Sequence, residues 1–353
     1  MTSKQPKNSV VDRGVVDSSV ADSSFIWVGG YTPEMEGDQG TGIAALRRTG
    51  SVVEYLGVVA KTLSPSFLTR SGDVLYAVGE SDPSVSAFRI TGETLVPLAT
   101  EPAAGTSPCS LRVIDSLLIE ACYGDGAVGV HVLDAHGIPG PAVQTLTDAG
   151  NGPHKVQDGP HAHDVLRVDA TTVLTTDLGT DRVHIHTLTA DRLTRTGSLD
   201  LPAGTGPRDL LLHPSGVVWV LGEISNEIIV LTRDGDTFAI TGIVALPGAT
   251  AGDHSAAMAP SADGRFVYVG HRGSNTVSVV SVDDSGTELV PVASIDCGGD
   301  WPRHLVVDGD FLHVANQRSS SVTTFRFGAD GIPELLGSIA VPTPTYLLVD
   351  ALS

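Results

Sequence analysis

The feature of this sequence that most constrains its fold is a short pattern that recurs along the chain. In each copy a proline, often followed by a polar or charged residue, leads into an apolar strand, as at Trp301-Pro302-Arg303-His304-Leu305. The prolines of five further copies are Pro65, Pro108, Pro160, Pro207 and Pro344, and a seventh copy, around His254, lacks the proline. Self-similarity at a period of ~40–50 residues is the signature of a repeat architecture. The sequence therefore predicts seven structural units of one kind.

Each unit contains several short apolar stretches separated by turn residues. After Pro65 come the stretches 74–78, 84–88 and 95–98, which makes four strands in one unit. Seven such units predict an all-β fold, a seven-bladed β-propeller with four-stranded antiparallel blades, over residues 25–353. A pair of β-sandwiches is the alternative, but it does not need seven equivalent units. In Val183-His184-Ile185-His186 apolar and polar residues alternate as in a half-buried strand, so we expect His184, His186 and the similar His131 at the surface.

The two ends of the repeat fit together. The first unit, which begins at Phe25, lacks a proline-led strand, and residues 344–350 are a copy of that strand without a unit of their own. We expect the C-terminal strand to join the first blade and close the ring, because an open ring leaves apolar blade faces in water. Residues 1–24 are polar and lack the apolar core of a signal peptide, so we expect a disordered N-terminal tail outside the propeller.

Composition argues against several classes of partner. The net charge of −20 disfavours nucleic acid and anionic membrane surfaces, which require clustered cations. No stretch approaches the ~20 apolar residues of a membrane span. Three widely spaced cysteines, Cys109, Cys122 and Cys297, are no disulfide framework and favour a reducing compartment, the cytoplasm. A small anionic substrate remains compatible, since it needs only a few arginines in a cleft, and we expect a monomer or a weak homo-oligomer.

Polar residues recur at two places in the repeat that a propeller brings to its central channel. The residues just after the proline, or near the corresponding place, are Ser66, Cys109, His161, Arg208, His254, Arg303 and Thr345. The residues at the end of the following strand are Glu80, Tyr123, Asp177, Glu223, His271 with Arg272, and Asn316 with Gln317. Two arginines and two histidines in one ring are more than a purely structural channel requires. We therefore predict a functional site at the mouth of the channel.

Several residues of these rings have more than one interpretation. His161 and His163 are two apart and point the same way along a strand, which fits a general base, a metal pair or satisfied polar groups. Because no third ligand stands at a diagnostic spacing, we expect no metal. Arg208 and Arg303 either contact the substrate or pair with carboxylates, and Glu223 is their counter-ion or an acid/base group. Asp177 is functional or part of a turn, and the long connection 145–159 is a lid or a solvated insertion.

Several stretches resemble the lactonase family of seven-bladed propellers, which includes bacterial 6-phosphogluconolactonases and fungal carboxymuconate cyclases. They include Gly159-Pro160-His161-Ala162-His163, Gly206-Pro207-Arg208, Gly222-Glu223-Ile224-Ser225-Asn226, Arg272-Gly273, Trp301-Pro302-Arg303-His304 and Ala315-Asn316-Gln317. The resemblance covers the chain from Phe25 and implies a site made of His161 or His163, Arg208, Glu223 and Arg272. The sequence departs from the family at Asp209, where a histidine is usual, and at Gly222 and His271, where asparagines are usual.

The function that these residues indicate is a hydrolase that opens a sugar-acid lactone. A histidine would activate water, Arg208 or Arg272 would stabilise the oxyanion, and Arg303 would grip a carboxylate or phosphate. We expect further substrate contacts from His304, Asp177, His254, Tyr123 and Gln317. The sequence contains no phosphate-binding glycine loop and no Cys-x-x-Cys pair, and we expect no cofactor. The alternatives are a lactonising cyclase of a muconate-like dicarboxylate and a non-catalytic propeller that binds a ligand or a protein.

Overall fold

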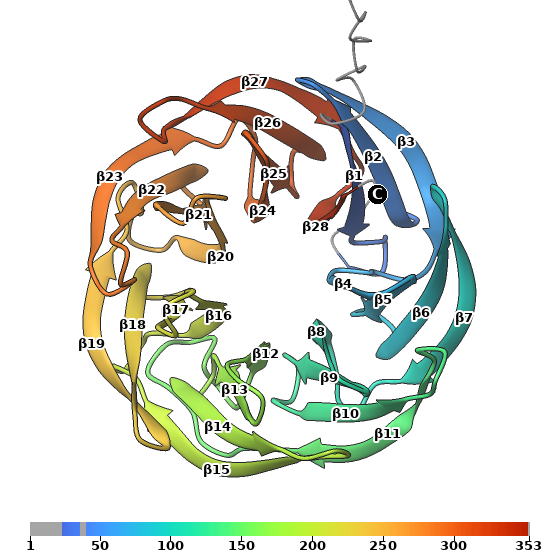
Figure 1. Ribbon diagram of the computed structural model, residues 1–353, viewed down its shortest axis with the longest axis vertical. Helices are drawn as coiled ribbons and strands as arrows, with labels where there is room; N and C mark the ends of the chain where they lie inside the picture. The colour runs from blue at the N-terminus through green and yellow to red at the C-terminus, as the bar shows by residue number, and fades with distance from the viewer. Residues whose placement is uncertain (1–22, 36–39, 352–353) are drawn as a thin grey trace, which may run out of the picture.

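In the computed structural model, which describes residues 23–35 and 40–351, the chain forms seven four-stranded antiparallel sheets arranged in a ring (Figure 1). This confirms the predicted seven-bladed propeller. The 28 regular elements within the described residues are all β-strands. The predicted disordered tail, residues 1–24, lies outside the described residues except for Ser23 and Ser24, which already belong to the first strand. The described residues also contain no helix with the length and apolar character that a bilayer crossing requires.

In every blade the innermost strand lies at the axis and three strands follow outward (Figure 1). Blade 1 consists of β28 (Pro344–Ala351), β1 (Ser23–Gly30), β2 (Gly42–Thr49) and β3 (Val52–Lys61). Blade 2 consists of β4 (Leu68–Ser71), β5 (Val74–Gly79), β6 (Ser84–Thr91) and β7 (Thr94–Pro102). Blade 3 consists of β8 (Pro108–Ile114), β9 (Leu117–Cys122), β10 (Val128–Leu133) and β11 (Pro139–Leu146).

The remaining blades repeat this order. Blade 4 consists of β12 (Ala162–Arg167), β13 (Thr172–Asp177), β14 (Arg182–Leu188) and β15 (Leu193–Asp200). Blade 5 consists of β16 (Pro207–Leu212), β17 (Val218–Gly222), β18 (Glu227–Asp234) and β19 (Thr237–Ala245). Blade 6 consists of β20 (His254–Pro260), β21 (Phe266–Arg272), β22 (Thr276–Val282) and β23 (Leu289–Asp296). Blade 7 consists of β24 (Pro302–Asp308), β25 (Phe311–Asn316), β26 (Ser321–Phe327) and β27 (Pro333–Ala340).

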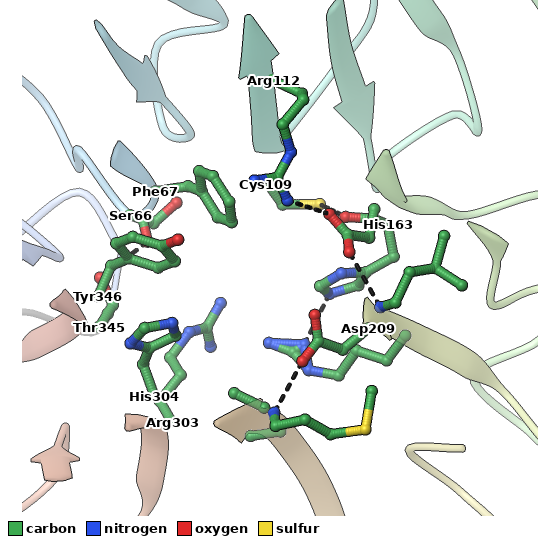
Figure 2. Close-up of a pocket in the computed structure, with 16 residues that line it drawn as sticks. Ser66, Phe67, Cys109, Arg112, His163, Asp209, Arg303, His304, Thr345 and Tyr346 are labelled. Carbon is green, nitrogen blue, oxygen red and sulfur yellow. Dashed lines mark hydrogen bonds and ion pairs between the residues drawn. The ribbon is translucent and has the colours of Figure 1, made fainter. Parts of the chain in front are cut away.

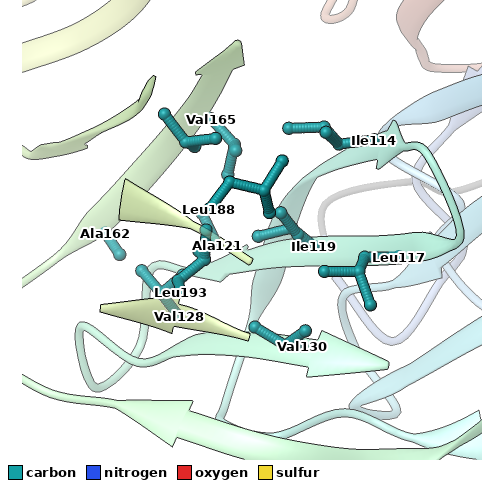
Figure 3. Close-up of a cluster of buried hydrophobic side chains, with 11 residues drawn as sticks. Ile114, Leu117, Ile119, Ala121, Val128, Val130, Ala162, Val165, Leu188 and Leu193 are labelled. Carbon is teal, nitrogen blue, oxygen red and sulfur yellow. The ribbon is translucent and has the colours of Figure 1, made fainter. Parts of the chain in front are cut away.

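The hydrophobic core lies between neighbouring blades. In one cluster Ile119 and Val130 of blade 3 pack with Val165 and Leu188 of blade 4 (Figure 3). Burying one such side chain contributes about 1.5–3 kcal/mol, and similar clusters link other blades around the ring. Because each blade contacts a neighbour on both sides, its central strands are apolar on both faces.

This packing overturns the surface positions expected for three histidines. His131, His184 and His186 lie on the third strands of blades 3 and 4 and are 0%, 3% and 0% exposed. Each makes a hydrogen bond inside the protein: His131 Nδ1 to the Gly140 carbonyl oxygen at 2.8 Å, His184 Nδ1 to Ser198 Oγ at 2.7 Å, and His186 Nε2 to Thr175 Oγ1 at 2.9 Å. Alternation of polar and apolar residues indicates two different faces of a strand, but in a propeller neither face meets solvent.

The last strand closes the ring as predicted. β28 pairs antiparallel with β1, with Ile26 opposite Val349 and Val28 opposite Leu347. Leu347 is 1% exposed and packs in a cluster that joins blade 1 to blade 7. At the junction the Tyr31 amide donates to the Thr343 carbonyl oxygen at 3.1 Å, and Thr343 Oγ1 donates to the Tyr31 carbonyl oxygen at 2.7 Å.

The proline-led pattern has a local structural reason. Directly before the proline the chain takes a left-handed turn in five copies, at Ser64 (φ 42°), Ser107 (φ 50°), Gly206 (φ 59°), Trp301 (φ 67°) and Thr343 (φ 38°). A residue before proline is disfavoured in the right-handed helical region, and the proline then fixes φ near −65°. The pair therefore sets the direction in which each innermost strand enters the channel.

Candidate active site

Equivalent hydrogen bonds place one residue of each blade in a ring around the axis. In blade 5 the Glu223 amide donates to the Gly206 carbonyl oxygen at 2.8 Å, and in blade 7 the Gln317 amide donates to Trp301 at 3.0 Å. The same bond recurs in blades 1 to 4, and in blade 6 Arg272 pairs with His254 at this place. This first ring consists of Tyr31, Glu80, Tyr123, Leu178, Glu223, Arg272 and Gln317.

β-Bulges in the innermost strands create a second ring. Between Pro207 and Asp209 of β16, and between Pro302 and His304 of β24, the register with the next strand skips one residue. A bulge re-aims the side chain of the extra residue, which here is an arginine in both blades. The second ring consists of Ser66, Cys109, His163, Arg208, Ala256, Arg303 and Thr345, and all seven line one cavity on the axis (Figure 2).

The bulge distinguishes the two predicted histidines. In blade 5 the bulge follows Pro207 directly, whereas in blade 4 it follows Ala162, two residues after Pro160. His163, the first residue of the bulge in blade 4, is therefore the counterpart of Arg208. His161 does not line the cavity but stacks on Tyr123, with 4.5 Å between ring centroids. Both nitrogens of His161 face acceptors, the Tyr123 carbonyl oxygen at 2.6 Å and Asp158 Oδ1 at 3.0 Å. Of the pair, only His163 faces the space that a substrate would enter.

Asp177 lies behind the cavity wall. It is 1% exposed, and its Oδ1 accepts hydrogen bonds from the amides of His161 at 2.8 Å, Gly179 at 3.0 Å and Thr180 at 3.2 Å. The structure thus places it in the turn after β13, the second of its two sequence-based interpretations. Leu178, and not Asp177 as predicted from its place at the end of a strand, occupies the first-ring position of blade 4.

Glu223 is the centre of a cation cluster. Its Oε2 lies 2.7 Å from Arg272 Nη2 and 3.3 Å from Arg208 Nε, and its Oε1 lies 3.1 Å from His254 Nδ1. Burial raises the pKa of Glu223, but the charge of Arg272, the hydrogen bond from His254 and the charge of Arg208 outweigh it, so the pKa is well below the usual value. Burial lowers the pKa of Arg272 to about 10, which leaves it charged at neutral pH. Glu223 and Arg272 are therefore both charged throughout the physiological pH range.

Arg303 is held by a separate group at the junction of the first and last blades. Its Nη2 donates to the Tyr31 hydroxyl at 2.6 Å, and that hydroxyl donates to Glu80 Oε1 at 3.0 Å. Its Nη1 donates to Gln317 Oε1 at 3.4 Å. Burial raises the pKa of Tyr31, so the phenol keeps the proton that it donates to Glu80. Sequence reasoning missed Tyr31, although its position at the end of the first apolar strand was a usable signal.

His163 is a neutral imidazole beside a guanidinium. Its Nε2 accepts a hydrogen bond from Arg208 Nη1 at 2.8 Å. Burial, followed by repulsion from Arg208, lowers the pKa of His163 well below 6.5. At pH 7 the ring therefore carries a lone pair on the nitrogen that faces Arg208.

The opposite wall of the cavity is aromatic. The His304 ring packs against Tyr346 with 3.9 Å between centroids, and Tyr346 packs against Phe67 at 4.2 Å, both pairs in tilted arrangements. Burial lowers the pKa of His304 to about 3, and its Nδ1 accepts the Leu347 amide at 3.2 Å. Figure 2 shows these rings across the cavity from His163 and Asp209. His304 thus supplies a flat neutral surface rather than a charge.

Comparison with known proteins assigns the family. The model of the family described as "Lactonase, 7-bladed beta-propeller" matches residues 25–349. The chain belongs to this lactonase family. It is 31% identical to a 6-phosphogluconolactonase of Bacillus subtilis over 306 residues. The aligned region covers 81% of this chain and 87% of the relative.

Solved structures of this lactonase family superpose closely. A Lactobacillus plantarum protein is 30% identical, with a TM-score of 0.86 over 93% of this chain and 99% of that one. The periplasmic gluconolactonase of Pseudomonas aeruginosa is 26% identical, with a TM-score of 0.84 over 93% of this chain and 99% of that one.

One further cluster of titratable groups in this lactonase propeller lies outside the cavity. Asp148, Asp177 and His184 approach one another closely enough for a metal ion. However, Asp148 Oδ2 lies 3.0 Å from Arg182 Nη1 and its Oδ1 lies 3.2 Å from Arg195 Nη1. With both oxygens of Asp148 engaged by guanidinium groups, the cluster is best described as an ion-pair network that fastens the connection after β11 to blade 4. A lid motion of that connection stays a prediction.

Proposed function

We propose that this protein is a hydrolase that opens an anionic sugar-acid lactone at the mouth of the propeller channel. The observation that carries the proposal is the convergence of Arg208, Arg272 and Arg303 on one site, where Glu223 and Glu80 are their ion-pair partners. A third carboxylate of the cavity, Asp164, has Arg112 beside it, so guanidinium groups outnumber carboxylates at this site in a chain whose net charge is −20. Such a site attracts an anion, and membership of the lactonase family supplies the reaction class.

The mechanism begins with a change of partner at Arg208. In the free protein Arg208 Nη1 donates to His163 Nε2. When a lactone carbonyl oxygen takes the place of the imidazole, Arg208 polarises the carbonyl group and the Nε2 lone pair becomes available to a water molecule. His163 then removes a proton from this water as its oxygen attacks the carbonyl carbon.

The two arginines of the Glu223 cluster stabilise the charge that develops. Arg208, backed by Arg272, faces the oxyanion of the tetrahedral intermediate. As the intermediate collapses, the ring C–O bond breaks and the leaving alkoxide takes the proton from the His163 imidazolium. Glu223 fixes the two guanidinium groups and is therefore a positioning residue. His254, which Glu223 holds through Nδ1, offers a second imidazole for the base.

Arg303 is placed to bind the anionic group of the substrate. It lines the same cavity as His163 and Arg208, and the Tyr31–Glu80 pair orients it. Two relatives are named for substrates with and without a phosphate group: one is a 6-phosphogluconolactonase and the other a gluconolactonase. A phosphate or a carboxylate fits the fork of Arg303 equally well. We place the reaction in the cytoplasm because all three cysteines are buried free thiols.

The test is a panel of lactones with the purified protein. We expect 6-phosphogluconolactone to be opened faster than its spontaneous hydrolysis, and Arg303→Met to raise KM about 10- to 100-fold for this lactone but not for uncharged lactones. Arg265→Met, at an exposed outer position, is the matched control. No rate above the uncatalysed reaction for any lactone contradicts the proposal. If the protein instead consumes a muconate, followed as a loss of its absorbance, it is a lactonising cyclase that uses the same cations.

A further inference from the structure

Two carboxyl groups that line the cavity belong to residues that directly follow a second-ring residue in the sequence. Asp164 follows His163 on β12, and Asp209 follows Arg208 on β16, so they hold equivalent positions in neighbouring blades. Both line the cavity. The mechanism above uses neither of them, and their presence in a cavity built for an anion requires an explanation.

The hydrogen bonds indicate where a proton lies in this pair. Asp164 Oδ1 accepts from Ser110 Oγ at 3.0 Å, Asp164 Oδ2 accepts from the Leu210 amide at 3.0 Å, and Arg112 Nη2 lies 3.9 Å from Oδ1. Asp164 is thus stabilised as a carboxylate.

Asp209 has weaker support for a negative charge. Its Oδ2 accepts a hydrogen bond from the Met258 amide at 2.7 Å. Burial, and then repulsion by Asp164, raise the pKa of Asp209 far above that of an ordinary carboxyl group. When the pair holds a single proton, the proton therefore lies on Asp209 rather than on Asp164.

We propose that the Asp164–Asp209 pair is a recognition subsite for the ring hydroxyl groups of a sugar-acid lactone. A hydroxyl group both donates and accepts a hydrogen bond, and a pair made of one carboxylic acid and one carboxylate offers both partners. The inference rests on the proposed function, and it specifies that the substrate is polyhydroxylated rather than an unsaturated dicarboxylate.

The opposite wall fits the same class of ligand. The packed rings of Phe67, Tyr346 and His304 face Asp209 across the cavity (Figure 2). A flat apolar wall opposite a few placed polar groups is the usual arrangement of a small-molecule site. A sugar ring presents C–H groups on its faces and hydroxyl groups at its edge, and it can meet both walls at once.

The experiment compares two lactones of the same ring size. Glucono-δ-lactone carries hydroxyl groups and δ-valerolactone carries none. We expect Asp209→Leu to lower kcat/KM for glucono-δ-lactone about 10- to 100-fold, the effect of losing a hydrogen bond from a charged or acidic group, and to leave δ-valerolactone within about twofold. Asp209→Asn is the matched control, because an amide also donates and accepts. We expect it to keep the preference for the hydroxylated lactone. Thermal melting of each variant verifies folding.

A second measurement separates this inference from the proposed function. Calorimetric titration with gluconate and with 5-hydroxyvalerate measures binding without turnover. Weaker binding of gluconate alone by Asp209→Leu supports the subsite even if the wild-type protein opens no lactone. Equal loss for both ligands, or no loss for either, overturns the subsite whether or not the wild-type protein is a lactonase.

Discussion

Arg303 Nη2 donates a hydrogen bond to the Tyr31 hydroxyl at 2.6 Å across the junction between the last blade and the first. Tyr31 also exchanges two hydrogen bonds with Thr343 at the start of the closing strand. One residue therefore takes part in closing the ring and in orienting an arginine of the candidate active site. The position of Arg303 therefore depends on the closure, through a contact with Tyr31 that joins the two ends of the sequence.

Tyr31→Phe tests this coupling. The substitution removes the hydroxyl between Arg303 and Glu80 and leaves the aromatic ring in place. We expect KM for an anionic lactone to rise about 10-fold, which is the worth of one hydrogen bond to a charged group, with kcat changed less than about threefold. Tyr76→Phe is the control, because its hydroxyl bonds the Gly137 carbonyl oxygen at 2.7 Å outside the cavity. Equal kinetics for the two variants would show that Tyr31 does not position Arg303.

Closure by β28 supplies stability. Deletion of residues 341–353 removes the innermost strand of blade 1 and exposes Ile26 and Val28, so we expect loss of cooperative unfolding. Leu347→Ala is the milder change, and we expect it to lower the free energy of unfolding by about 2–5 kcal/mol. Leu336→Ala, at a side chain that is 46% exposed, should stay within about 0.5 kcal/mol. A truncated protein that melts at the wild-type temperature would refute the closure.

Glu223→Gln leaves Arg208 and Arg272 without their carboxylate. Removing one partner of a buried ion pair costs about 3–5 kcal/mol of stability, and we expect kcat to fall about 10²-fold or more as the guanidinium groups lose their orientation. Urea denaturation and steady-state rates measure the two effects. A variant as stable and as active as the wild type would contradict the central role of Glu223.

The same variant predicts a change in acid stability. Because the pKa of Glu223 is lower in the folded than in the unfolded protein, its stabilising contribution is present above the unfolded value of ~4.3 and is lost as pH falls toward the folded value. We expect the wild-type melting temperature to fall more steeply below pH ~4.5 than that of Glu223→Gln. Parallel curves of melting temperature against pH would count against this reading.

His163→Ala and His161→Ala separate the two histidines. We expect the former to lower kcat about 10²–10⁴-fold, as loss of a general base does, and the latter to act mainly on stability. Because the pKa of His163 is well below 6.5, the acid limb of kcat/KM in the wild type should lie below that pH. A limb centred near 6.5, or full activity of His163→Ala, would assign the base to another group, for which His254 is the first candidate.

The proline-led pattern allowed the blades and the closure to be predicted because the same left-handed turn precedes five of the innermost strands. The bulge that follows leaves no such mark in the sequence. Strict alternation placed His161 and His163 on one face, whereas the bulge in β12 turns only His163 to the cavity. Local pattern fixes where a strand begins, but the register with its neighbour decides which side chain reaches the axis.

The carboxyl pair shows a second limit. In the sequence, Asp209 stands out because the lactonase family usually has a histidine at this position. Nothing in the sequence around Asp164 indicates that the two carboxyl groups lie together. Their proximity depends on the packing of blade 4 against blade 5, and their proton depends on donors from three blades, Ser110 of blade 3, Leu210 of blade 5 and Met258 of blade 6. Such a group arises from tertiary contacts and has no signature in the spacing of residues.

The chain order of β28 has a consequence during synthesis. It is the last of the 28 strands to leave the ribosome, yet it pairs with the first. Until it emerges, Tyr31 has no Thr343 to bind, so the residue whose hydroxyl group accepts from Arg303 lacks its contacts with the closing segment. Blade 1 is therefore completed only after blade 7, and the contacts that join Tyr31 to Thr343 form last, although Tyr31 is made first.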